Sequence, residues 1–105
     1  MGAQRYRLLF NPIFEKDLDE ITDYISITLQ NPEAALRLVD DLENAIYRRL
    51  ETPLAFAPYP SSKARPHPYY RMNVRNYSVF YVVIEDTMEA RRVLYARRNL
   101  DKLLP

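Results

Sequence analysis

The sequence contains no cysteine, and this absence excludes two kinds of protein at once. Without thiols the chain can form neither a disulfide framework nor a thiolate metal site, and we expect no metal and no cofactor. It also lacks any apolar run near the roughly 20 residues that cross a membrane. The N-terminus turns directly into strand-like sequence, which leaves no room for a signal peptide. These absences predict a cytoplasmic protein that does not bind membranes.

The residues that are present fit one globular domain. The chain has 105 residues, of which 48% are hydrophobic and 28% charged, and we expect a single domain over 1–105. Its net charge of +1 hides an asymmetry. Residues 1–62 hold 6 basic and 10 acidic side chains, a sum of −4, whereas residues 63–105 hold 9 and 4, a sum of +5. This split indicates either an anionic partner for the second half or internal pairing between the halves.

The first half predicts a strand followed by a helical hairpin. Residues 5–10 alternate between two faces, as a half-buried strand does. Asn11-Pro12 and Asn31-Pro32 each place a capping side chain before a proline that suits the first helical position. Apolar residues recur at helical spacing after each of these dipeptides, so we expect helices near 12–30 and 32–51. The connection is very short, which predicts that the helices are antiparallel neighbours.

The second half predicts a proline-rich segment and then a sheet. Residues 52–68 contain five of the chain's eight prolines and are either functional or a simple connection back to the sheet. From residue 70 the apolar period becomes two, which predicts strands at 70–74, 77–84 and 90–98. The middle strand is apolar on both faces and is therefore expected at the centre of the sheet.

The turns and the tail complete the predicted topology. Glycine is absent from the first turn, Arg75-Asn76, and Asn76 is expected to take the positive φ there. Residues 85–88 are expected to form the second turn, and residues 99–104 a short helix or tail. The order β-α-α-β-β-β predicts an α+β fold: an N-terminal strand, an antiparallel helical hairpin and a three-stranded antiparallel meander.

Two stretches of the meander resemble the RelE/ParE superfamily, the toxins of bacterial type II toxin–antitoxin pairs. One covers residues 70–81 (YRMNVRNYSVFY) and the other covers residues 92–99 (RVLYARRN). The two helical segments also resemble the family, so the likeness extends over nearly the whole chain. It implies the β-α-α-β-β-β fold and one of two activities. RelE-like members cleave mRNA in the ribosomal A site, whereas ParE-like members poison DNA gyrase and cut nothing themselves.

The resemblance to RelE-like enzymes implies candidate residues for metal-independent cleavage of mRNA. Arg71 and Arg98 match positions of basic residues, while Tyr95 and His67 are the candidates for the acid/base group. A strand tyrosine is more often packing, and a loop histidine is more often solvated. Asn73 and Ser78 stand where the RelE-like pattern has basic residues, and both departures count against catalysis because they remove charge that stabilises the reacting phosphate.

Further arginines are candidates for binding RNA or an acidic segment of an antitoxin. This set comprises Arg75, Arg91 and Arg97, with Asn73 beside them. The same arginines can instead pair with the acidic helix faces of the chain itself. The resemblance also implies a hetero-oligomer with a cognate antitoxin, whose extended C-terminal segment would cover the sheet and helix surface.

Three functions follow from the resemblance, and we favour ribosome-dependent mRNA cleavage, with the ribosome and its mRNA as partners. The alternative is inhibition of DNA gyrase without nuclease activity. A third reading is a degenerate toxin that retains only antitoxin binding. The two-sided apolarity of residues 77–84 further predicts a sheet face left open for the antitoxin, which would make the free toxin less stable than the complex.

Overall fold

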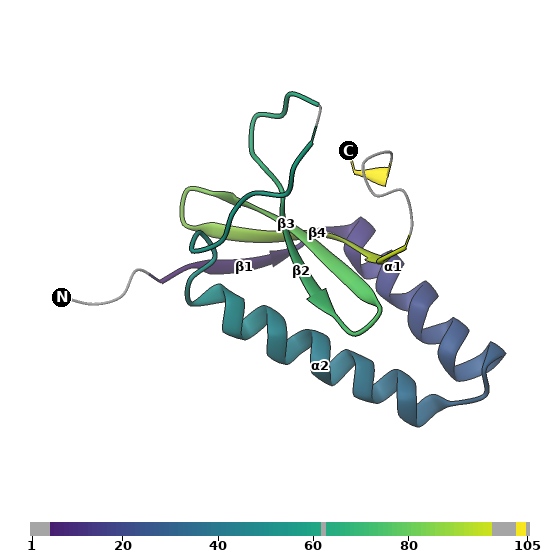
Figure 1. Cartoon of the computed structure of the whole chain (residues 1–105). Helices are drawn as coiled ribbons and strands as arrows, with labels where there is room; N and C mark the ends of the chain where they lie inside the picture. The colour runs from purple at the N-terminus through teal and green to yellow at the C-terminus, as the bar shows by residue number, and fades with distance from the viewer. Residues whose placement is uncertain (1–4, 62, 98–102, 105) are drawn as a thin grey trace.

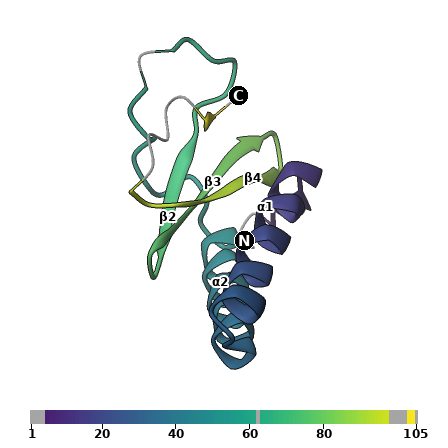
Figure 2. The same ribbon diagram turned by 90° about the vertical axis from the view of Figure 1, so that its right-hand side faces the viewer.

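A computed structural model describes residues 5–61, 63–97 and 103–104 (Figure 1). The strands are β1 Arg7–Phe10, β2 Tyr70–Val74, β3 Tyr77–Ile84 and β4 Thr87–Tyr95. The helices are α1 Pro12–Asp23, the π-helix η1 Tyr24–Thr28 and α2 Pro32–Leu50. The predicted α+β fold is confirmed, with the helical hairpin on one side of the sheet (Figure 2). Within the described ranges no helix is both long and apolar enough to span a membrane.

Both helices begin where the asparagine–proline pairs predict. The side chain of Asn11 accepts a hydrogen bond from the Ile13 amide at 2.9 Å, and the side chain of Asn31 accepts one from the Ala34 amide at 3.1 Å. These bonds satisfy amides that have no partner inside the helix, and the prolines lack the N–H that would otherwise need one. The sequence therefore locates both helix starts correctly.

The first helix ends differently from the prediction. The expected helix over 12–30 is α-helical only to Asp23 and continues as η1, in which the Leu29 amide donates to the Tyr24 carbonyl at 3.0 Å. That bond spans five residues rather than four, which widens the helix locally. Gln30 then takes a positive φ of 52° and turns the chain into α2.

The sheet has the order β1-β4-β3-β2, so β3 is internal, as its two-sided apolarity predicts. Strands β2, β3 and β4 form the antiparallel meander, whereas β1 runs parallel to β4 at the edge. β1 is short, however, and pairs only with Thr87–Ala90. The remainder of β4 therefore continues beyond the end of its outer neighbour, a feature that shapes the groove described below.

The first hairpin turn contains Arg75 and Asn76, as predicted, but Asn76 is not the residue with positive φ. Arg75 takes that conformation, with a φ of 55°, and Glu85 does the same in the second turn. The prediction for Asn76 was wrong because, in both two-residue turns, the first position bears the unusual conformation that matches the twist of the strands. The second turn contains only Glu85 and Asp86, so β4 begins at Thr87 rather than at residue 90.

A bulge in β4 changes the direction of its arginines. Phe80 lies opposite Arg92, but Tyr81 lies opposite Ala90, which leaves Arg91 as the extra residue. Neighbouring strand residues normally point to opposite faces, and a bulge interrupts that alternation. Arg91 can therefore contact Tyr69 on the side of the sheet away from the hairpin. The next residue, Arg92, contacts Asp17 and Leu103 at the edge of the sheet. A strict period of two would have separated them.

The main core lies between the sheet and the helical hairpin. Its helical side chains are Phe14, Leu38, Leu42 and Ile46, and its strand side chains are Tyr70, Met72, Val74, Val79, Tyr81, Met88, Ala90 and Val93. The hydroxyl group of Tyr81 is fully buried, donates to the Pro53 carbonyl at 2.8 Å and accepts from Arg49 at 3.0 Å. This tyrosine ties α2 and the start of the proline-rich segment to the centre of the sheet.

The opposite face of the sheet, which we call the second face, is not left open. Phe80, Val82 and Leu94 are covered by Tyr69 and Leu104, with Tyr59 and Leu103 at the margin. The prediction of an uncovered apolar face was therefore wrong. The proline-rich segment and the C-terminal leucines bury the apolar side chains that β3 directs away from the helices. Residues 99–102 of the predicted tail lie outside the described residues.

Candidate functional site

Arg71 is held on the second face by two polar neighbours. Its Nε atom donates to Ser78 Oγ at 2.9 Å and to Asn73 Oδ1 at 3.0 Å. Ser78 Oγ in turn donates to Asn73 Oδ1 at 2.8 Å, which closes the triangle, and Ser78 is fully buried. The two residues that replace family basic residues therefore orient the arginine that remains.

Aromatic rings surround this arginine. The carbon of the Arg71 guanidinium lies 5.8 Å from the centre of the Tyr59 ring and 5.9 Å from that of Phe80. Tyr69 stands edge-on to Phe80, and the guanidinium groups of Arg65 and Arg91 lie 5.2 and 5.8 Å from the Tyr69 ring. Cations over aromatic faces are stabilised by the ring quadrupole. The second face therefore combines positive charge with aromatic rings packed edge to face.

Arg91 is partly neutralised within the chain. Its Nε donates to Glu89 Oε1 at 3.1 Å, and Glu89 Oε2 accepts from the Asn11 side chain at 3.2 Å. A longer hydrogen bond of 3.4 Å runs from Arg91 to the Tyr69 hydroxyl. This contact network joins β4 to the start of α1 and fixes the position of Arg91.

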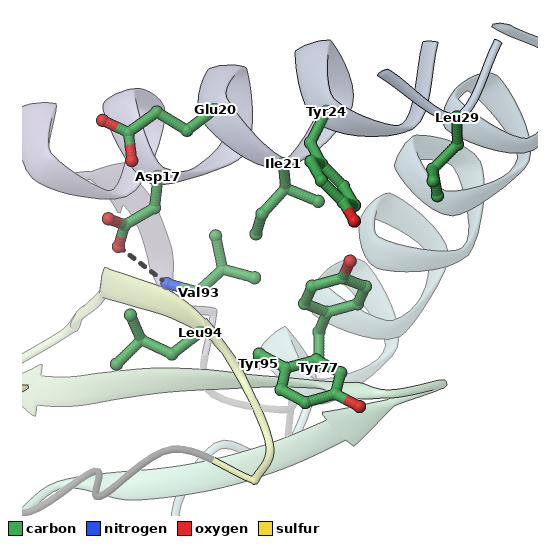
Figure 3. Close-up of a pocket in the computed structure, with 9 residues that line it drawn as sticks. All are labelled: Asp17, Glu20, Ile21, Tyr24, Leu29, Tyr77, Val93, Leu94 and Tyr95. Atoms are coloured by element: carbon green, nitrogen blue, oxygen red, sulfur yellow. Dashed lines mark hydrogen bonds between the residues drawn. The ribbon is translucent and has the colours of Figure 1, made fainter. Parts of the chain in front are cut away.

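A groove lies on the other side of the sheet, between α1, η1 and the end of β4 (Figure 3). Its volume is about 600 Å³. The residues lining it are mostly aliphatic and aromatic, with two carboxylates at one end: Asp17, Glu20, Ile21, Tyr24, Leu29, Tyr77, Val93, Leu94 and Tyr95. The π-helical turn forms part of the wall, and such turns are frequent at functional sites.

Three tyrosines gather in this groove. Tyr24 and Tyr77 point toward each other from η1 and β3, and Tyr95 lies beside Tyr77 with ring centres 5.9 Å apart. Burial, followed by the nearby Tyr95 and Tyr24 hydroxyls, raises the pKa of Tyr77 above its usual value of 10.0. The phenol group of Tyr77 therefore keeps its proton at physiological pH and can form hydrogen bonds. Tyr24 and Tyr95 remain 54% and 41% exposed, which makes them available to a partner.

The carboxylate end of the groove is occupied by a buried ion pair. Asp17 accepts from Arg92 Nε at 2.7 Å and from Arg92 Nη2 at 3.0 Å, and it also accepts from the Val93 amide at 3.2 Å. Arg92 uses its remaining terminal nitrogen to donate to the Leu103 carbonyl at 2.7 Å. Hydrogen bonding to Asp17 raises the pKa of Arg92 above its already high ordinary value. This pair thus links the groove, β4 and the C-terminal leucines.

The residues predicted to be catalytic are not brought together. Arg71 lies on the second face, opposite Phe80, whereas Tyr95 lies opposite Tyr77 on the side of the helical hairpin. His67 is half-buried in the proline-rich segment, and no described residue forms a hydrogen bond with its imidazole. Arg98 lies outside the described residues.

The residues predicted to bind RNA or an antitoxin are also divided. Arg75 forms an ion pair with Asp41 of α2 at 2.5 Å, as the alternative of internal pairing with a helix predicts. Asn73 and Arg91 lie on the second face in the contacts given above, while Arg97 is exposed after the end of β4. Among the described residues, no group of three potential metal ligands comes together.

Sequence reasoning did not assign roles to Asp17 and Glu89, and it treated Ser78 only as a missing cation. Asp17 is one of several acidic residues in the first helix, so its charge alone does not distinguish it from its neighbours. One signal was present, because Asp17 falls on the apolar stripe that contains Phe14, Leu18 and Ile21. A charged residue on a buried stripe requires a partner, which Arg92 supplies.

Comparisons with known proteins agree with this fold. Residues 8–100 match the sequence model for the ParE toxin of the type II toxin–antitoxin system parDE. A comparison with functionally curated proteins finds no match.

Solved structures of two related kinds resemble the chain. A protein of the chromosomal ParDE system from P. aeruginosa is 21% identical, with a TM-score of 0.75 over 90% of this chain and 100% of that one. The isolated E. coli RelE toxin is 22% identical, with a TM-score of 0.52 over 94% and 99%. A chain of the RelB–RelE complex from Methanococcus jannaschii is 27% identical, with a TM-score of 0.51 over 92% and 99%. With its fold and its family match in agreement, this chain belongs to the ParE toxin family, within the RelE/ParE superfamily of type II toxins.

Proposed function

We propose that this toxin arrests growth by binding DNA gyrase and that it does not itself cleave nucleic acid. The observation that carries the proposal is the separation of Arg71 and Tyr95 onto opposite faces of the sheet. General acid–base catalysis requires the proton-transferring group within hydrogen-bond reach of the reacting atoms. A phosphate bound by Arg71 would therefore be on the wrong side of the sheet for Tyr95.

The surroundings of Arg71 support the same conclusion. Its Nε is engaged by Ser78 and Asn73, which are neutral where RelE-like enzymes have cations. Fewer cations mean less stabilisation of the charge that develops on a reacting phosphate. A toxin that acts by occupying a surface needs no such constellation. The match to the ParE toxin model is a further support, because ParE-like members are the gyrase inhibitors of this superfamily.

The test is expression of the toxin without its antitoxin, combined with a supercoiling assay on purified gyrase. We expect growth arrest with filamentation and a DNA-damage response, and loss of supercoiling in vitro. Arg71→Ala and Tyr95→Phe should both remain toxic, since neither residue carries chemistry under this proposal. Continued growth of the wild-type strain would favour the degenerate toxin. Arrest with normal gyrase activity would overturn the proposed target.

A second candidate is ribosome-dependent mRNA cleavage, which one observation favours. The aromatic rings of the second face are surrounded by Arg65, Arg71 and Arg91. Proteins bind single-stranded RNA through such a combination, because cations contact the phosphates and aromatic rings stack on the bases. Toeprinting on translating ribosomes distinguishes this candidate. Cuts at the A site that disappear in Arg71→Ala would establish it, whereas intact mRNA in arrested cells would exclude it.

A further inference from the structure

The two helices of the hairpin enclose an apolar slot, which we call the interhelical slot. The helices meet at the turn around Gln30 and separate toward their other ends (Figure 1). The slot has a volume of about 330 Å³ and lies between the first half of α1 and the second half of α2, beside the end of β1. Its apolar lining consists of Phe10, Phe14, Leu18, Val39, Leu42 and Ile46. This volume is at the lower end of the range for ligand pockets, so the slot suits single side chains of a partner.

The floor of the slot is fixed by the main core. Phe14, Leu42 and Ile46 are each 2% exposed, and the Phe14 ring lies 5.3 Å from the Phe10 ring between centres. Leu18 and Val39 are half-buried and form the accessible part of the walls. Because packing against the sheet already holds these side chains, a partner would spend little free energy on ordering the slot.

Two glutamates border the slot, one from each helix. Glu15 belongs to α1 and Glu43 to α2, and both are exposed. Neither carboxylate forms an ion pair or a hydrogen bond with a described residue. Two like charges beside one apolar surface repel each other, and a cation placed between them is attracted by both. The slot therefore favours a partner that carries a positive charge next to an apolar group.

The neighbouring charges of the chain do not neutralise these glutamates. Arg75 and Arg92 reach the helices from the sheet. Arg75 pairs with Asp41, and Arg92 pairs with Asp17. Residues 12–51 contain 10 acidic and 4 basic side chains, a sum of −6. None of the basic side chains of these helices lines the slot: Lys16, Arg37, Arg48 and Arg49. The hairpin surface therefore attracts cations and repels both nucleic acid and acidic segments.

We infer that the interhelical slot binds a basic and apolar segment of DNA gyrase, with a lysine or arginine between Glu15 and Glu43 and an apolar side chain against Leu18 and Val39. The inference rests on the proposed function and names the surface through which the toxin holds its target. An enzyme that acts on DNA carries lysine and arginine side chains on its surface, because it must contact phosphates. Such a surface complements the charge of the hairpin.

Removal of the two charges tests the inference. The affinity for purified gyrase is measured by calorimetry for the wild-type toxin and for two double variants. Glu15→Gln with Glu43→Gln should weaken binding about tenfold, the combined range of two partly exposed ion pairs. Asp19→Asn with Asp40→Asn is the matched control, because it removes the same charge from exposed residues of the same helices that do not line the slot. The control should change the affinity by less than about twofold.

The outcomes separate the inference from the proposed function. Equal affinities of the two double variants would overturn the inference and leave gyrase as the target. A wild-type toxin that failed to bind gyrase would overturn both. The affinity for the antitoxin is measured in parallel. If Glu15→Gln with Glu43→Gln weakened only antitoxin binding, the slot would belong to the antitoxin, and the inference would be wrong.

Discussion

The two faces of the sheet are covered in different ways although the same strands build both. The face toward the hairpin is closed by aliphatic and aromatic side chains from α1 and α2, with the Tyr81 hydroxyl as a buried polar tie. On the second face, a smaller apolar cluster is bordered by arginines that are hydrogen-bonded to Ser78, Asn73 and Glu89.

This difference separates the structural arginines from those available to a partner. Arg75 and Arg92 have carboxylate partners on the helices, so part of the positive charge of the second half is used inside the chain. The side-chain hydrogen bonds of Arg71 go to the neutral groups of Asn73 and Ser78, so they do not compensate its positive charge. The fold thus divides the arginines of the second half between those that pair with carboxylates of the chain and Arg71, which bonds neutral groups.

The largest expected effect concerns the ion pair between Asp17 of α1 and Arg92 of β4. Asp17→Ala leaves Arg92 without its carboxylate and the Val93 amide without its acceptor. Removing one partner of a buried pair typically costs about 3–5 kcal/mol, and we expect a loss of that order in urea unfolding. Asp19→Ala, an exposed neighbour on α1, should change the stability by less than about 0.5 kcal/mol. A loss below about 1 kcal/mol for Asp17→Ala would contradict the importance of the pair.

The next largest effect concerns the hydrogen bonds of the buried Tyr81 hydroxyl group on the hairpin side of the sheet. Tyr81→Phe removes a fully buried hydroxyl group and leaves Arg49 and the Pro53 carbonyl without it. Unsatisfied buried groups cost about 1–3 kcal/mol, and we expect a loss in this range together with faster proteolysis within residues 52–56. Tyr95→Phe is the control, since no described residue hydrogen-bonds its hydroxyl. Equal stabilities of the two variants would show that the tie is dispensable.

A smaller effect is expected on the second face. Ser78→Ala should cost about 0.5–1.5 kcal/mol, because Arg71 Nε keeps its bond to Asn73 when the serine hydroxyl is lost. The NMR signal of the Arg71 Nε–H should at the same time exchange faster with water. Ser26→Ala in η1 removes a hydroxyl that bonds only a helix carbonyl and should leave that signal unchanged. A slow Arg71 signal in Ser78→Ala would mean that Asn73 alone holds the guanidinium.

The smallest effect depends on pH. The pKa of Tyr77 is raised in the folded chain, so the unfolded tyrosine loses its proton first as the pH increases. The contribution of Tyr77 to the free energy of unfolding is complete below a pH of about 10. It is lost above that pH, because ionisation then favours the unfolded state. We expect Tyr77→Phe to flatten the decline in thermal stability above pH 10. An identical decline in both proteins would assign the alkaline sensitivity to other groups.

Much of the fold was readable from the sequence because it depends on local patterns. The asparagine–proline pairs marked both helix starts, and the two-sided apolarity of residues 77–84 marked the central strand. The errors arose where a local preference competes with the geometry of the whole hairpin. Asn76 tolerates positive φ better than Arg75 does, yet the turn places that conformation on the first residue, where Arg75 also reaches Asp41.

The candidate site was predicted less well, for a physical reason. The resemblance to RelE-like enzymes supplied Arg71, Asn73 and Tyr95 as candidates, the arginines of the second half added Arg91, and the family motifs were sufficient to indicate a toxin. The sequence by itself thus determined the helices, the meander and the family, because periodicity and capping act over a few residues. Only the tertiary structure decided which faces meet. A short β1, a bulge at Arg91 and the Asp17–Arg92 pair, 75 residues apart in sequence, depend on long-range register that no local pattern records.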